Sequence, residues 1–229
     1  MKTTKKTIAL GDSIIKGVVL NIEVNGKMHY AMTDHNIIDQ VADNLRTEVV
    51  NLGKMGCTVE AGERILDRHL STIQDGEYVI LCYGGNDSDY NWREIAMSPS
   101  AEHHPKTPLA VFEETYARII AKVRQAGLTP VVLSLPEMDA ERYYKFFTAV
   151  FSEEEKRNVS RWLKNGPQAI AAGHELYNEA VKRVAKAAEA ILVDVSKAFA
   201  NVQQSLCVDG IHPNHMGQKQ IAQLIQQAL

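Results

Sequence analysis

This sequence has few cysteines, a small net charge and no long apolar run. Its 229 residues include only three cysteines, Cys57, Cys82 and Cys207, whose odd number and scattered positions exclude a disulfide framework and favour a reducing compartment. The net charge of −3 gives no reason to expect a nucleic-acid or anionic-membrane partner. The apolar run near the start, 7–10, is too short for a signal peptide or a membrane span. We therefore expect a cytoplasmic protein with no membrane insertion.

Nucleotide-binding motifs are missing as well. Neither a P-loop nor a Gly-x-Gly-x-x-Gly motif follows the first predicted strand, which excludes the common phosphate and dinucleotide sites, and we expect no cofactor. No repeat, low-complexity segment or linker divides the chain. A composition of 45% hydrophobic and 23% charged residues predicts a single domain over 1–229 with a full core.

Predicted strands alternate with predicted helices along the chain. Apolar runs predict strands at 7–10, 48–51, 78–83, 129–135 and 190–195. Apolar residues at helical spacing predict helices at 14–19, at 37–45 with Asp34 as the cap, at 61–70, 109–125, 168–188 and 214–228. This alternation indicates an α/β fold with a parallel sheet, right-handed crossovers and helices on both faces.

Three segments interrupt the alternation. An Asn-Gly pair at 25–26 lies between two short strand-like runs and predicts a small β-hairpin within 21–32. The segment 88–108 is polar and broken by prolines, so we expect an irregular insert. The segment 136–166 has a helical pattern and many aromatic residues, and we expect a second insert there.

Polar motifs follow the predicted strands. They are Gly-Asp-Ser at 11–13, a glycine-bearing loop at 52–58, Gly-Gly-Asn-Asp at 84–87 and, before the last helix, Asp-Gly-Ile-His at 209–212. Ligands of open α/β sheets bind at the carboxyl ends of the strands, so we expect these motifs to meet there. Each motif alone is weak evidence, because Ser and Asp are common helix caps and Gly and Asn are common turn residues.

In this order, the motifs resemble the four blocks of the SGNH subgroup of the GDSL esterase and lipase family. The Ser, Gly, Asn and His of those blocks fall here on Ser13, Gly56, Asn86 and His212. The resemblance implies a three-layer αβα fold with a five-stranded, mostly parallel, flavodoxin-like sheet. It also implies an oxyanion hole formed by the backbone N–H groups of Ser13 and Gly56 and by the side-chain amide of Asn86.

The residues themselves suit acyl transfer, which needs a nucleophile, a base, an orienting carboxylate and oxyanion donors. Ser13 begins a predicted helix, and a serine hydroxyl reacts only when a base takes its proton. His212 is a suitable base, because imidazole titrates near neutral pH. Asp209 lies three residues earlier, so a single turn can direct its carboxylate at the ring of His212.

Other residues near the motifs have two interpretations. Asp12 and Asp87 either bond to loop backbone or contact the substrate, and Tyr90 and Trp92 are further candidate substrate contacts. A second class of function is a binding module that holds an ester or a sugar without cleaving it. A third is metal-assisted hydrolysis, although we predict no metal site; its candidate ligands are Asp209, His212, His215, His103 and His104.

The composition of the two inserts gives an indication of the substrate. They hold more than half of the aromatic residues of the chain: Tyr90, Trp92, Tyr143, Tyr144, Phe146, Phe147, Phe151 and Trp162. These aromatics either cover the site or pack on one another or in a homo-oligomer. Charges interleave them, which argues against a long apolar tunnel. We expect a small-molecule ester with a short acyl group on a polar alcohol, such as an acetylated carbohydrate; a lysophospholipase or an acyl thioesterase is the alternative.

Overall fold

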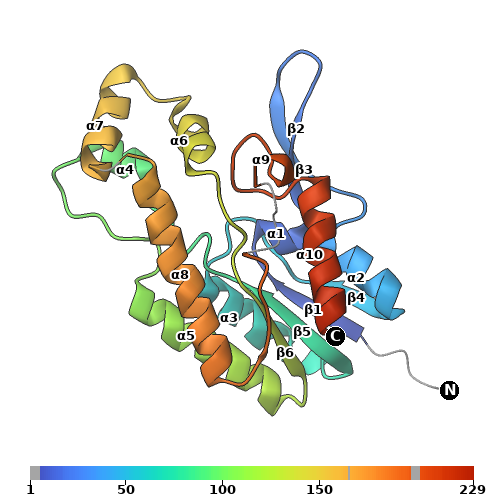
Figure 1. Cartoon of the computed structure of the whole chain (residues 1–229). Coiled ribbons are helices and arrows are strands. Elements are labelled where there is room, and N and C mark those ends of the chain that lie inside the picture. Colours follow the sequence, from blue (N-terminus) through green and yellow to red (C-terminus); the bar gives the residue numbers. More distant parts are fainter. Residues whose placement is uncertain (1–5, 165, 197–201) are drawn as a thin grey trace.

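A five-stranded parallel sheet forms the centre of the molecule (Figure 1). The computed structural model describes residues 6–164, 166–196 and 202–229. The strand order is β4-β1-β5-β6-β7, and every neighbouring pair is parallel. The strands are β1 (Lys6–Gly11), β4 (Glu48–Asn51), β5 (Gly76–Cys82), β6 (Thr129–Leu133) and β7 (Ile191–Val193). The order confirms the flavodoxin-like sheet expected from the resemblance.

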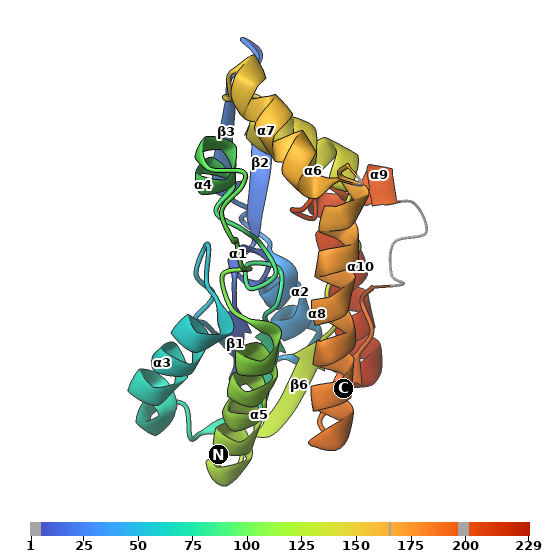
Figure 2. The same cartoon turned by 90° about the vertical axis from the view of Figure 1, so that its left-hand side faces the viewer.

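Helices cover both faces of the sheet and make a three-layer αβα fold (Figures 1 and 2). Successive strand residues point to opposite faces, so Ile8 and Leu10 join one core cluster while Ala9 joins the other. The first cluster packs against α3 (Val59–His69), α5 (Leu109–Gln125) and α8 (Gln168–Ala187). The second packs against α2 (Ile37–Leu45) and α10 (His215–Ala228). Burial on both faces explains why the strand sequences are continuously apolar.

Helix α1 (Ser13–Lys16) is shorter than predicted. It ends at Gly17, which has φ 80° and meets the side chain of Asn36 so closely that an added Cβ would lie 2.3 Å from its Cβ. Only glycine adopts this conformation without strain. Val18 and Val19, expected in the helix, instead begin strand β2 (Val18–Ile22), because β-branched residues after a left-handed cap favour a strand.

The β-hairpin around the Asn-Gly turn is present. Strand β2 pairs antiparallel with β3 (Met28–Met32) in a separate two-stranded sheet. The next helix, α2, spans the predicted residues 37–45, but its cap differs from the prediction. Its cap is Asn36 rather than Asp34, because the side chain of Asn36 accepts the N–H groups of Ile38 and Asp39 and the carboxylate of Asp39 accepts the N–H of Asn36.

The two inserts form one small layer, which we call the aromatic cap. It consists of α4 (Trp92–Met97), α6 (Ala140–Thr148) and α7 (Glu153–Leu163). The prediction that 88–108 is irregular throughout was therefore wrong: Asn91 caps α4, and the apolar residues of that helix pack on the second insert. In both views the cap and the hairpin stand at the same end of the molecule (Figures 1 and 2).

Three short elements complete the chain: the 3₁₀ turn η1 (Leu70–Thr72), helix α9 (Val202–Ser205) and the loop that leads into α10. Asn214 caps α10 by accepting the N–H groups of Met216 and Gly217. No helix in the described ranges is both long and apolar enough to cross a membrane.

Candidate active site

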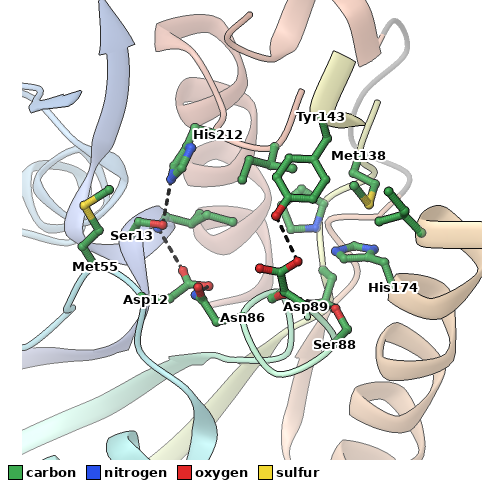
Figure 3. Close-up of a pocket in the computed structure, with 17 residues that line it drawn as sticks. Asp12, Ser13, Met55, Asn86, Ser88, Asp89, Met138, Tyr143, His174 and His212 are labelled. Atoms are coloured by element: carbon green, nitrogen blue, oxygen red, sulfur yellow. Dashed lines mark hydrogen bonds between the residues drawn. The ribbon is translucent and has the colours of Figure 1, made fainter. Parts of the chain in front are cut away.

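Ser13 lies where β1 turns into α1. Asp12 caps the helix, with its Oδ1 accepting the N–H of Ile14 at 2.9 Å, so Ser13 is the first helical residue. Gly11 is required by close packing, because a Cβ there would lie 2.5 Å from Cγ1 of Ile15 and 2.7 Å from the carbonyl oxygen of Cys82. The turn therefore fixes the serine hydroxyl at the carboxyl edge of the sheet (Figure 3).

His212 and Asp209 reach Ser13 from the loop before α10. The Nε2 of His212 lies 2.9 Å from the Oγ of Ser13, and its Nδ1 lies 2.7 Å from the Oδ2 of Asp209. The exposed fractions of Ser13, His212 and Asp209 are 7%, 5% and 0%. The structure thus joins the three predicted residues in one buried hydrogen-bonded chain.

The loop that carries Asp209 and His212 is closed by its own backbone. The N–H of Cys207 donates to the carbonyl of His212 at 2.8 Å, and Leu206 forms a β-bridge with Pro213. Gly210, at φ 76°, accepts the N–H of Asp139 at 2.8 Å, which ties the loop to the start of α6. These bonds fix the direction in which the imidazole points.

The carboxylate of Asp209 is held by donors on both oxygens. Its Oδ1 accepts the N–H groups of Ile211 and His212 at 3.2 and 3.1 Å, and its Oδ2 accepts from the His212 ring. Burial alone would raise the pKa of Asp209, but the hydrogen bonds and the positive charge available on His212 outweigh burial and lower it. Asp209 is therefore an anion at neutral pH, and an anion at Nδ1 stabilises an imidazolium.

Asn86 and Gly56 lie beside Ser13 in the same cavity. The Nδ2 of Asn86 donates to the Oδ2 of Asp12 at 3.1 Å, and since an amide nitrogen carries two hydrogens, a second N–H remains for the cavity. Gly56 has φ 71°, a conformation that favours glycine and brings backbone to the cavity wall. All four residues of the motif blocks, Ser13, Gly56, Asn86 and His212, therefore line one cavity.

Asp12 connects the serine turn to the amide of Asn86. It is 3% exposed, and burial raises its pKa to about 6, against the opposing effects of the N–H of Ile14, the charge of His212 and the amide of Asn86. Asp12 also lies on the cavity wall. Both sequence interpretations of Asp12 thus remain, because it bonds to backbone and faces the cavity.

The cavity has a volume of about 180 Å³ and two different walls (Figure 3). We call Asp12, Ser13, Gly56 and Asn86 the scaffold wall. The opposite side, which we call the cap wall, consists of Ser88, Asp89, Met138, Tyr143, Ile170 and His174. On the cap wall, Asp89 accepts hydrogen bonds from Trp92 Nε1 at 2.8 Å and from the hydroxyl of Tyr143 at 2.9 Å, and it pairs with Lys106 at 2.9 Å.

His174 differs from its neighbours on the cap wall. It projects from α8 into the cavity, and burial lowers its pKa to about 4, so the ring is neutral at pH 7. Within the described residues its two ring nitrogens make no hydrogen bond. A neutral imidazole with two free nitrogens can donate one hydrogen bond and accept another.

Three of the predicted substrate contacts do not line the cavity. Asp87 is fully buried, and its Oδ1 accepts from the N–H of Val59 at 2.9 Å and the hydroxyl of Thr107 at 2.7 Å. Tyr90 and Trp92 pack inside the aromatic cap, where the ring of Trp92 stacks on a phenylalanine at 4.6 Å. Sequence proximity to the Asn motif suggested these contacts, whereas side-chain packing directs them elsewhere.

Sequence reasoning missed Tyr30, Asp89, Tyr143 and His174 as site residues. Tyr30 comes from the hairpin and donates to Asp209, while the others line the cap wall. Tyr143 was among the insert aromatics expected either to cover the site or to pack on one another, but nothing in the local sequence singled it out for the cavity. Only the tertiary arrangement of hairpin, inserts and α8 brings these four to the site.

The histidines of the metal alternative are engaged separately. His103 bonds to the carbonyl of Ser98, and His215 contacts the hydroxyl of Thr33. In the part of the chain that the structure describes, no three His, Cys, Asp or Glu side chains are grouped to hold a metal ion.

Comparison with known proteins gives one family match, over residues 9–220, to the GDSL-like lipase/acylhydrolase family.

Among solved structures, LAE5, an alpha/beta hydrolase from the metagenome of Lake Arreo in Spain, has a TM-score of 0.66 at 20% identity, covering 98% of this chain and 94% of that one. A proposed SGNH hydrolase from Slackia heliotrinireducens has a TM-score of 0.64 at 15% identity, covering 99% of both chains. Axe2, an acetylxylan esterase from Geobacillus stearothermophilus, has a TM-score of 0.58 at 19% identity, covering 100% and 96%. These structures share the fold. No curated protein matches the chain.

Proposed function

The chain belongs to the GDSL-like lipase/acylhydrolase family and is a hydrolase of ester bonds; from this premise we propose that Ser13, His212 and Asp209 cleave carboxylic esters through an acyl-enzyme intermediate. The observation that supports these roles is the hydrogen-bonded chain from the Ser13 hydroxyl through the His212 ring to the Asp209 carboxylate, with links of 2.9 and 2.7 Å. These links have the lengths that proton transfer between a nucleophile and its base requires.

In the first half of the reaction, the Oγ of Ser13 attacks the ester carbonyl carbon while the Nε2 of His212 takes the hydroxyl proton. The carbonyl oxygen becomes an anion. The N–H groups of Ser13 and Gly56 and the second N–H of Asn86 are the proposed donors to that anion. The intermediate collapses, the bond from carbon to the alcohol oxygen breaks, and His212 gives its proton to the departing alcohol.

In the second half, a water molecule repeats the attack on the acyl-Ser13 ester. His212 takes a proton from the water, the acid leaves, and the proton returns to the Oγ of Ser13. Asp209 stays ionised through both halves, because its pKa lies below its usual range, and it stabilises the imidazolium that forms twice in each turnover.

We further propose a short acyl group on a polar alcohol as the substrate class. The cavity is compact, at about 180 Å³, and the cap wall offers polar groups to an alcohol: the nitrogens of His174, which make no hydrogen bond among the described residues, and the Tyr143 hydroxyl and Asp89 carboxylate, which bond to each other. Such a wall suits a sugar hydroxyl better than a long alkyl chain. The esterase Axe2, whose name gives acetylated xylan as its substrate, shares the fold.

A panel of esters tests this proposal. Aryl esters of two to ten acyl carbons, acetylated xylose and glucose, and short and long acyl-CoA are compared by kcat/KM, with Ser13→Ala as the blank. We expect the highest values at roughly two to four carbons and on acetylated sugars. A rate that keeps rising past eight carbons would instead indicate a lysophospholipase or a long-chain thioesterase, and binding of sugar esters without turnover would indicate a binding module.

The reducing location expected from the sequence remains part of the proposal. All three cysteines, Cys57, Cys82 and Cys207, are free thiols and buried. Free buried thiols are usual where glutathione keeps cysteine reduced. Recovery of the protein with the cytosolic fraction of its own cells would support this placement, and recovery from the medium would overturn it.

A further inference from the structure

The β2–β3 hairpin brings a fourth side chain to the catalytic residues. Tyr30, on β3, donates from its hydroxyl to the Oδ2 of Asp209 at 3.2 Å, and its ring centre lies 5.1 Å from that of His212, tilted by 58°. Tyr30 lies outside the cavity lining and outside the parallel sheet. It therefore touches the aspartate and the histidine without facing the substrate.

The oxygen that accepts from Tyr30 is also the oxygen that holds the histidine. The Oδ2 of Asp209 takes both the Nδ1 of His212 at 2.7 Å and the hydroxyl of Tyr30 at 3.2 Å. A second donor on a carboxylate oxygen draws off part of its negative charge. The carboxylate of Asp209 therefore stabilises an imidazolium at His212 less strongly when the Tyr30 hydroxyl is present than when it is absent.

Tyr30 remains a donor throughout the working range of pH. Partial desolvation of its hydroxyl raises the pKa of Tyr30, although the residue is 38% exposed, and the charge of Asp209 and the hydrogen bond to it raise the pKa further. A protonated phenol beside an ionised carboxylate can only donate to it. The contact is thus a fixed dipole directed at the aspartate.

The hairpin is held on the loop that carries Asp209. The N–H of Leu20, the cross-strand partner of Tyr30, donates to the Sγ of Cys207 at 3.4 Å. Val19, Leu20 and Cys207 form a buried apolar cluster against Phe146, whose ring meets Tyr30 edge-on at 6.4 Å. Hairpin, loop and α6 therefore fix the Tyr30 hydroxyl over the carboxylate.

We propose that Tyr30 is a positioning residue that sets how strongly Asp209 stabilises the protonated form of His212. This inference rests on the proposed function, in which His212 must accept and release a proton in each half-reaction. The hydroxyl of Tyr30 keeps the imidazolium from being held too strongly. The hairpin thereby tunes the base.

Other titratable groups face His212 and belong to the test. Asp12 approaches from the β1–α1 turn and interacts with the charge of His212, and Cys207 lies on the same loop with its pKa raised by burial. Replacing Tyr30 with Phe leaves Asp12, Cys207, Asp209 and the ring contact in place. A change in that variant therefore reports the hydroxyl alone.

The test compares Tyr30→Phe with Tyr144→Phe, which removes a hydroxyl that bonds to the carbonyl of Lys156 in the aromatic cap. In Tyr30→Phe we expect the acidic limb of kcat/KM against pH to move to higher pH by roughly 0.5 unit, and kcat to fall about threefold to tenfold with KM unchanged. Tyr144→Phe should reproduce the parent profile. A Tyr30→Phe profile that overlays the parent would leave Tyr30 with a packing role only and overturn the inference.

A second measurement needs no substrate. In the Ser13→Ala background, the ring of His212 is titrated by ¹⁵N NMR with Tyr30 present and with Tyr30→Phe. We expect protonation to persist to higher pH in the variant. If the unmutated protein cleaves no ester while this shift appears, the proposed function fails and the Tyr30 inference stands. If the unmutated protein cleaves esters and no shift appears, the proposed function stands and the Tyr30 inference fails.

Discussion

The two walls of the cavity are built from different kinds of contact. Residues of the scaffold wall lie in the turns and loops that follow sheet strands, and mainly backbone geometry places them: Asp12 caps a helix by accepting a backbone N–H, and Gly56 has a left-handed φ, while the carboxylate of Asp12 in turn holds the amide of Asn86. On the cap wall, Asp89 and Tyr143 are held by side-chain bonds to each other and to Trp92. His174, on the same wall, has its ring nitrogens free among the described residues.

This difference suggests a division of labour. Groups fixed by the backbone cannot rearrange without disturbing the sheet, which suits donors that must meet a transition state. Groups fixed by other side chains can change with little cost to the fold, which suits contacts that choose the alcohol. Mutations on the scaffold wall should therefore lower kcat, and mutations on the cap wall should alter KM for particular esters.

The largest effect is expected at the proposed nucleophile, Ser13, and its proposed base, His212. Ser13→Ala, His212→Ala and the double variant should each lose roughly 10⁴–10⁶ in kcat, because the residues act as one unit. The measurement is steady-state hydrolysis of a short aryl ester by purified protein. A double variant whose loss approaches the product of the two single losses would contradict the assignment of this pair.

Asn86→Ala should come next, with kcat lower by about 10²–10³ and KM little changed, as expected for a lost oxyanion donor. Its amide lies on the scaffold wall beside Ser13. Full kinetics on the same ester separate the two parameters. If KM rises while kcat holds, Asn86 binds the ground state, and the division between the walls breaks down.

Asp12→Asn tests whether the carboxylate of Asp12 orients the amide of Asn86. Asparagine can still accept the N–H of Ile14, but it no longer offers two acceptor oxygens, so the Nδ2 of Asn86 loses its charged partner. We expect kcat to fall roughly tenfold. In the Asn86→Ala background the same change should cost little, since the amide it orients is gone. Equal losses in both backgrounds would show that Asp12 acts independently of Asn86.

His174→Phe probes the cap wall. The change keeps a ring of similar size and removes both nitrogens, so KM for an acetylated sugar should rise about threefold to tenfold while kcat changes less than about twofold. KM for a simple aryl ester serves as the matched control and should stay level. A large fall in kcat on both esters would place His174 with the catalytic groups.

Asp87 lies in the loop after β5 and outside the cavity lining, so its replacement should alter stability more than catalysis. Burial raises the pKa of Asp87 to about 6, above the unfolded value of 3.8. The folded state then binds more protons between these values, so the contribution of Asp87 to stability is present below about pH 4 and is lost as pH rises through 6.

Asp87→Asn retains an acceptor for Val59 and Thr107 and cannot titrate. Relative to the parent, its Tm should therefore gain a few degrees between about pH 4 and pH 7. Thermal unfolding across that range, with the esterase rate recorded in parallel, gives the measurement. A parent–variant difference that is constant with pH would mean that the Asp87 carboxyl titrates alike in both states.

Much of the scaffold wall was predictable from sequence, because short apolar runs fix the strands and each motif follows one of them. Ser13, Gly56, Asn86 and His212 were all expected at one cavity, and all line it. Their roles in the reaction stay predictions until the variants are measured. The helix predicted through Val19 failed, because a left-handed glycine cap outweighed local propensity.

The cap wall was largely unpredictable for a physical reason. Whether an aromatic faces a cavity or another aromatic depends on how the inserts pack, and the periodicity of α6 is compatible with either. Trp92 was expected at the substrate but packs in the cap, whereas Tyr143 from the same cluster reaches the cavity. Tyr30 was hidden in the hairpin, since nothing local pairs it with a loop that lies 179 positions later.

The distance in sequence between the proposed nucleophile and the proposed base has a consequence for synthesis. Ser13 and His212 lie 199 positions apart, and His212 takes its place with the loop before α10, the helix that packs against α2. While the chain leaves the ribosome, the serine is exposed long before its base has been made. With the proposed roles, a nascent or truncated chain therefore carries an unactivated hydroxyl, and activity requires the contact between Ser13 and His212, whose large sequence separation slows its formation.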